Sequence, residues 1–122
     1  MKAASLSLLV LRSARLEAMR SFYEALGLTF VEEKHGAGPL HYSAQLGSTV
    51  LEIYPGETSP PINRKGSGAT MLGVSVESID SVIAQVQAQG SQIVTAPADS
   101  AWGRRAVILD PDGRAVEITS TK

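Results

Sequence analysis

The chain has no cysteine among its 122 residues. This absence excludes a disulfide framework, a thiolate metal ligand and a cysteine nucleophile. The chain also lacks an apolar run as long as the ~20 residues that a helix needs to span a bilayer. The apolar start at residues 5–11 is interrupted by Ser7, ends at Arg12 and has no small-residue cleavage site behind it. We therefore interpret it as a strand rather than a signal peptide, and expect a cytoplasmic protein with no membrane partner.

An excess of charge of one sign is missing as well. The net charge of −1 provides no basic face for a phosphate backbone, so we expect no nucleic-acid partner. Gly66-Ser67-Gly68 lacks the lysine and the following helix of a phosphate-binding loop, and serine-nucleophile motifs are absent. A content of 43% hydrophobic and 19% charged residues is typical of a globular protein.

What the sequence does contain is an internal repeat. Four positions recur 63 residues later: Leu16, Met19, Tyr23 and Gly27 correspond to Ile79, Val82, Val86 and Gly90. A strand-like run with a glutamate, Glu52 or Glu117, closes each half. Because roughly 60 residues bury too little apolar surface alone, the halves should share a core or a cleft. We predict one domain over 1–122, with repeats at 1–55 and 70–122 and a linker at 56–69.

Periodicity and turn residues predict the same element order in both halves. In the first, we expect a helix capped by Ser13 and stopped by Gly27, and in the second a helix capped by Ser78 and stopped by Gly90. The predicted strands are residues 5–11, 28–33, 41–46 and the run with Glu52, then 71–76, 92–95, 104–109 and 114–119. The predicted fold is α+β: two βαβββ modules whose mixed sheets curl around a cleft.

Several motifs follow one another in a characteristic order. They are the Ser-Phe-Tyr-Glu-Ala-Leu-Gly run at residues 21–27, Trp102-Gly103, the Asp-Pro-Asp-Gly turn at residues 110–113, and Glu117. Their order and duplication resemble the vicinal oxygen chelate superfamily, which includes glyoxalase I, bleomycin-resistance proteins and extradiol dioxygenases. The resemblance covers nearly the whole chain and implies a homodimer, with modules paired within or between chains. It does not identify a reaction, because this fold hosts lyases, oxygenases and pure binders.

The two glutamates are the main candidates for chemistry. Side chains alternate along a strand, so Glu52 shares a face with Tyr54 and lies opposite Leu51, and Glu117 has the same parity. We therefore expect two carboxylates in one cavity. Their mutual repulsion and desolvation would raise the pKa of at least one of them, which suits a catalytic acid or base.

The family resemblance implies that Glu52 and Glu117 are potential metal ligands. However, the family's first-strand ligand positions fall on Leu8 and Met71, which offer no donor to a hard or borderline cation. We therefore predict no tightly bound metal and no cofactor. A divalent metal held by Glu52 and Glu117 is the alternative.

Five further residues are candidates for ligand binding: Arg12, His41, Tyr54, Trp102 and Arg105. Trp102 either stacks on a planar ligand or fills a module boundary, and Tyr54 either lines the cavity or packs. The arginines either bind an anionic group or pair with the glutamates. For His41 we favour an exposed rim position beside the Gly36 to Pro39 turn over a role in the cavity.

These observations favour a small-molecule-binding protein of the glyoxalase and bleomycin-resistance type, which sequesters its ligand or modifies it by carboxylate acid/base chemistry. The alternative is a metal-dependent lyase, isomerase or dioxygenase of the glyoxalase I type. A dimeric module that only regulates or scaffolds a partner is a third possibility.

Overall fold

The computed structural model describes residues 3–57, 70–101 and 103–120; most of the predicted linker, 58–69, and Trp102 lie outside them. The first module contains β1 (Leu8–Ser13), α1 (Leu16–Ala25), β2 (Phe30–Glu33), β3 (His41–Leu46) and β4 (Thr49–Pro55). The second module contains β5 (Leu72–Ser75), α2 (Ile79–Ala88), β6 (Ile93–Ser100), β7 (Gly103–Leu109) and β8 (Ala115–Ser120). The predicted α+β fold of two βαβββ modules is confirmed.

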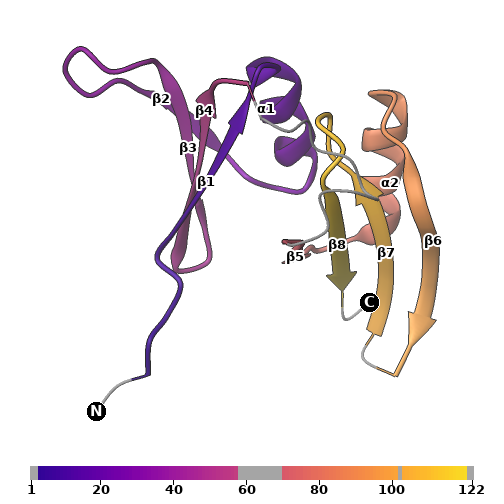
Figure 1. Ribbon diagram of the computed structural model, residues 1–122. Coiled ribbons are helices and arrows are strands. Elements are labelled where there is room, and N and C mark those ends of the chain that lie inside the picture. Colours follow the sequence, from indigo (N-terminus) through magenta and orange to yellow (C-terminus); the bar gives the residue numbers. More distant parts are fainter. Residues whose placement is uncertain (1–2, 58–69, 102, 121–122) are drawn as a thin grey trace.

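Each module forms its own four-stranded mixed sheet. The strand orders are β1-β4-β3-β2 and β5-β8-β7-β6. The first strand of each module pairs in parallel with the last, and the remaining pairs are antiparallel. Figure 1 shows the two sheets as separate units, with α1 on the side of the first sheet that faces the second module. Among the described residues, no helix combines the length and hydropathy needed to cross a membrane.

Both helices bury the stripe of apolar residues that the repeat predicted. Met19, Phe22 and Tyr23 on α1 are fully buried, and Ile79, Val82 and Val86 on α2 are nearly so. Leu51 and Ile53 of β4 are buried in the same core, whereas Glu52 between them is directed to the other face. The predicted alternation along β4 is therefore confirmed, and Val116 and Ile118 repeat it on β8.

The helix ends follow the sequence signals except at one N-terminus. Gly27 and Gly90 have the positive φ expected of glycine stops, and the Ser78 hydroxyl accepts a hydrogen bond from the Ser81 amide at 3.3 Å. The prediction that Ser13 caps α1 is wrong, because α1 has Arg15 at its N-cap, without a side-chain cap. Ser13 instead remains in β1, where it pairs with Pro55 of β4.

The sixth strand is longer than residues 92–95, which were predicted for it. It continues to Ser100 through Pro97, with two register shifts along its pairing with β7. Proline normally argues against a strand, since it cannot donate to the ladder. Here β6 is the edge of its sheet, where a missing donor and irregular pairing are tolerated.

A buried carboxylate joins the two modules. Asp110 Oδ2 accepts a hydrogen bond from the Tyr23 hydroxyl of α1 at 2.8 Å, and Oδ1 accepts the amides of Asp112 and Arg114 at 2.9 and 3.0 Å. The Arg114 guanidinium lies 3.2 Å from the same carboxylate and donates to the Arg12 carbonyl of β1 at 2.8 Å. Burial, and then the adjacent Asp110 charge, raise the pKa of Tyr23 well above its usual value. The Asp-Pro-Asp-Gly turn is therefore also the anchor between the modules.

Substituting Tyr23→Phe should lower the free energy of unfolding by about 1.5–3 kcal/mol, because a buried carboxylate loses one of its donors. Chemical denaturation at neutral pH measures this change. Tyr42→Phe is a matched control, since Tyr42 donates to Glu17, a largely exposed partner within the same module. Equal losses in the two variants would contradict an anchoring role for the Tyr23–Asp110 contact.

The same contact should make the protein sensitive to alkali. Folding raises the pKa of Tyr23, so its neutral hydroxyl stabilises the folded state. This stabilisation is complete below the pKa of about 10 that tyrosine has in the unfolded chain. It is lost as the pH rises through the higher pKa that Tyr23 has in the folded protein. Ionisation would place a phenolate beside the Asp110 carboxylate. The difference in unfolding free energy between wild type and Tyr23→Phe should therefore shrink above about pH 10. A difference that stays constant with pH would rule out this linkage.

Candidate functional site

The face of the first sheet opposite α1 gathers several of the predicted site residues. We call this surface the first open face. By strand register it carries residues of all four strands: Val10 and Arg12 of β1, Glu52 and Tyr54 of β4, His41 and Ser43 of β3, and Val31 and Glu33 of β2. Leu8 shares this parity on β1 and is 50% exposed, and Val31 is exposed too. Apolar side chains are thus left in solvent around a polar centre.

The centre of the first open face is an aromatic stack. The His41 and Tyr54 rings lie 4.0 Å apart at an interplanar angle of 9°, and the Arg12 guanidinium lies 5.6 Å from the Tyr54 ring centroid. His41 Nε2 is 3.7 Å from Glu52 Oε2. The structure therefore brings together four of the predicted site residues, Arg12, His41, Glu52 and Tyr54.

The favoured prediction for His41, an exposed position on the rim, is wrong. The residue is only 1% exposed. It is the first residue of β3, and its pairing with Glu33 of β2 directs the ring onto the sheet face, where Tyr54 covers it. Its place beside a turn did not predict exposure, because the burial of His41 is determined by its position on the strand and by the Tyr54 ring.

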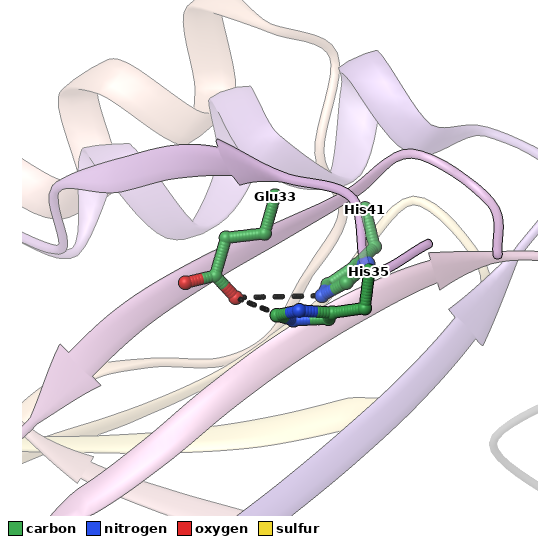
Figure 2. A group of neighbouring side chains, drawn as sticks. All are labelled: Glu33, His35 and His41. Atoms are coloured by element: carbon green, nitrogen blue, oxygen red, sulfur yellow. Dashed lines mark ion pairs between the residues drawn. The ribbon is translucent and has the colours of Figure 1, made fainter. Parts of the chain in front are cut away.

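Two further residues complete this cluster, and neither was predicted from the sequence. Figure 2 shows Glu33 and His35 directed toward His41 at the end of the β2–β3 hairpin. Glu33 Oε1 lies 3.4 Å from His41 Nε2 and 3.7 Å from His35 Nε2. The signal that could have revealed Glu33 is the hairpin register, which pairs it with His41.

The second sheet places its glutamate beside an arginine. Arg105 Nε of β7 donates to Glu117 Oε2 of β8 at 2.6 Å, with the two side chains 43% and 29% exposed. The neighbouring Arg104 pairs with Asp80 and Asp99 instead. An ion pair was one of the alternatives for Glu117, and the structure contains it.

Glu52 and Glu117 lie in separate sheets and have different partners, His41 for Glu52 and Arg105 for Glu117. In residues 3–57, 70–101 and 103–120, no hydrogen bond or ion pair joins the two side chains. A pocket of about 640 Å³ does lie where the modules meet, lined by Arg15 and Ser21 of α1 and by Gln89 and Asp110 of the second module. It contains neither glutamate.

The residues at the family's metal positions do not fit a metal. Leu8 and Met71 are 50% and 53% exposed; leucine has no donor atom, and the methionine thioether is too soft a ligand for a hard or borderline divalent cation. At Glu117, the guanidinium of Arg105 already neutralises the carboxylate and would repel a cation. The ligand set implied by the family resemblance is therefore incomplete in both modules.

Two βαβββ modules, each with a glutamate on the open side of its last strand, define a protein of glyoxalase-like architecture. The chain belongs to the Glyoxalase/Bleomycin resistance protein/Dioxygenase superfamily, whose family model matches residues 5–118. The predicted family is thus confirmed over nearly the whole chain.

The individual relatives share only low sequence identity with this chain. An uncharacterized protein of Mycolicibacterium smegmatis is 28% identical over 109 residues, covering 89% of this chain and 87% of the relative. Among solved structures, TnmS3, an antibiotic-binding protein from Streptomyces sp. CB03234, superposes with a TM-score of 0.71 at 21% identity, covering 100% of this chain and 99% of its own. A glyoxalase/bleomycin resistance protein/dioxygenase family enzyme from Burkholderia phytofirmans has a TM-score of 0.71 at 20% identity, with coverages of 98% and 100%. At these identities the two structures establish the fold.

The Arg105–Glu117 pair should contribute little to stability. A double-mutant cycle with Arg105→Gln, Glu117→Gln and the double variant should give a coupling energy of about 0.2–1 kcal/mol, because both side chains are partly solvated. Urea denaturation of the four proteins measures it. A coupling above about 2 kcal/mol would instead assign the pair a mainly structural role.

Proposed function

We propose that this chain is a cytoplasmic small-molecule-binding protein of the glyoxalase and bleomycin-resistance type, acting as one domain and holding a planar, partly apolar ligand. In this proposal, no metal is held by Glu52 and Glu117. The observation that carries it is the stack of Arg12, Tyr54 and His41 beside Glu52 on the first open face.

The composition of this face suits such a ligand. Small-molecule sites are mostly apolar, with a few placed polar groups that set orientation. Leu8 and Val31 supply exposed apolar surface, the Arg12 guanidinium supplies a planar group for stacking, and the Glu52 carboxylate supplies an acceptor. The structural similarity to TnmS3, described as an antibiotic-binding protein, is consistent with this class of ligand.

A ligand on one sheet face would remain largely exposed, whereas binding sites typically bury most of a ligand's surface. We therefore propose a homodimer in which the first open face of one chain covers the corresponding face of the partner's second sheet. Leu8 and Met71, at the first strand of each module, are large apolar side chains left about half exposed in one chain. Such pairing would bring Glu52 opposite the partner's Glu117, with Trp102 and Arg105 as further ligand contacts. Any turnover of the ligand would use the two carboxylates as acid and base.

Ligand binding is tested first by a thermal-shift screen of thiol conjugates, antibiotics and aromatic diols in the presence of a chelator, with hits titrated by calorimetry. Arg12→Gln should weaken binding of a hit about tenfold, the equivalent of losing one stacked cation–π contact. Arg20→Gln is the matched control, because Arg20 stacks on Tyr42 on the opposite side of the same sheet. Equal effects of the two substitutions would place the ligand elsewhere.

The dimer is tested by sedimentation at micromolar concentration. Leu8→Arg should convert the dimer to a monomer and abolish ligand binding, because it places a charge in an apolar contact. Ala18→Arg, on the exposed side of α1, should leave the dimer intact. A wild-type protein that is monomeric with and without ligand would contradict this arrangement.

A further inference from the structure

One buried nitrogen on the first open face has no partner. His41 Nε2 is inaccessible to solvent and makes no hydrogen bond. The other ring nitrogen, Nδ1, lies 3.2 Å from the Pro39 carbonyl oxygen, which can only accept, so Nδ1 carries the proton of the neutral ring. Nε2 then presents its lone pair to the Glu33 and Glu52 carboxylates, 3.4 and 3.7 Å away. A cation bound between Nε2 and these carboxylates would satisfy both the lone pair and the acceptor oxygens.

The atoms around that point are spaced as metal ligands. A Glu33 carboxylate oxygen and one nitrogen each from His35 and His41 all lie within 4.8 Å of one another, and the distances from Glu33 Oε1 to the two Nε2 atoms are 3.4 and 3.7 Å. Bonds of about 2.0–2.1 Å in a tetrahedral arrangement place neighbouring ligands about 3.3–3.4 Å apart. The two distances from Glu33 Oε1 are close to this spacing, and the side chains in Figure 2 would have to draw together around an ion to complete it.

We propose that Glu33, His35 and His41 form a site for a divalent first-row transition-metal ion, best matched by Zn²⁺. Two imidazoles and a carboxylate are suitable ligands for Zn²⁺ and the other late first-row transition metals, whereas Mg²⁺ and Ca²⁺ prefer oxygen ligands alone. A water or a ligand atom takes the fourth position.

Two features of the hairpin support the site. The Pro39 carbonyl orients the His41 ring and fixes its tautomer, the role that outer groups play for zinc-bound histidines. His35 is largely exposed at the hairpin end, so an ion can enter from solvent. The site uses neither Glu117 nor a first-strand residue. It shares His41 with the proposed ligand site, but its test needs neither the ligand nor the dimer.

Calorimetric titration of untagged, chelator-treated and dialysed protein with Zn²⁺ tests the site. One ion per chain should bind, and the two histidines are the only ones in the chain, so Zn²⁺ should shift both sets of imidazole NMR signals. Removing a group that only hydrogen-bonds a metal ligand typically lowers metal affinity about 10–100-fold, and removing a ligand itself should lower it at least as much. His35→Asn should therefore weaken Zn²⁺ binding by about 10–100-fold or more. This exposed position should tolerate the change without unfolding.

Glu33→Gln and Glu32→Gln form the matched pair of variants. Adjacent strand residues are directed to opposite faces of β2, so only the first substitution should weaken Zn²⁺ binding. Absence of binding up to millimolar Zn²⁺ would overturn the proposal. Binding that His35→Asn and Glu33→Gln do not alter would overturn it equally. Because Zn²⁺ alone is the probe, failure of the ligand screen leaves this result unaffected.

Discussion

The arrangement of the two modules depends on one buried charge. Asp110 sits at the turn between β7 and β8, with its carboxylate fully removed from solvent. A buried carboxylate is tolerated only when its acceptor positions are satisfied, and here the Tyr23 hydroxyl, two backbone amides and the Arg114 guanidinium do so. Because Tyr23 belongs to the first module and Arg114 to the second, satisfying this charge also sets where the modules lie. Arg114 extends the constraint to β1 through the Arg12 carbonyl.

Local periodicity predicted the fold well because both modules bury one regular face of each element. Leu51 and Ile53 flank Glu52 with the parity of a strand, and a stripe of the helical period places Met19 and Tyr23 in the core. Where the predicted end of an element is wrong, the reason is a contact with a residue far away in the sequence. Ser13 has a good capping side chain, but its pairing with Pro55 prolongs the strand. Such pairing depends on a partner about 40 residues away, which local propensity does not register.

The site was less predictable, because its chemistry depends on contacts between strands. Strand parity placed Glu52, Tyr54 and Arg12 on one face, and the structure has them together. The exposed position predicted for His41 was wrong because its burial comes from the stack with Tyr54. Glu33 was not predicted, because its contact with His41 depends on the register between β2 and β3. Trp102 lies outside the described residues, so its predicted role remains a prediction.

The internal repeat explains why the two modules differ chemically. Ser43 is paired with Glu52 and Val107 with Glu117, so His41 and Arg105, each two residues earlier, hold equivalent positions beside the two glutamates. Arg105 carries a permanent charge and neutralises Glu117 directly, which disfavours binding of another cation there. An imidazole at the same position offers a lone pair instead, and Glu33 and His35 add two donors next to it. The two modules thus differ at one equivalent position, which is His41 in the first and Arg105 in the second. The glutamate of the second module is already neutralised by its arginine, whereas the face of the first module can bind a cation.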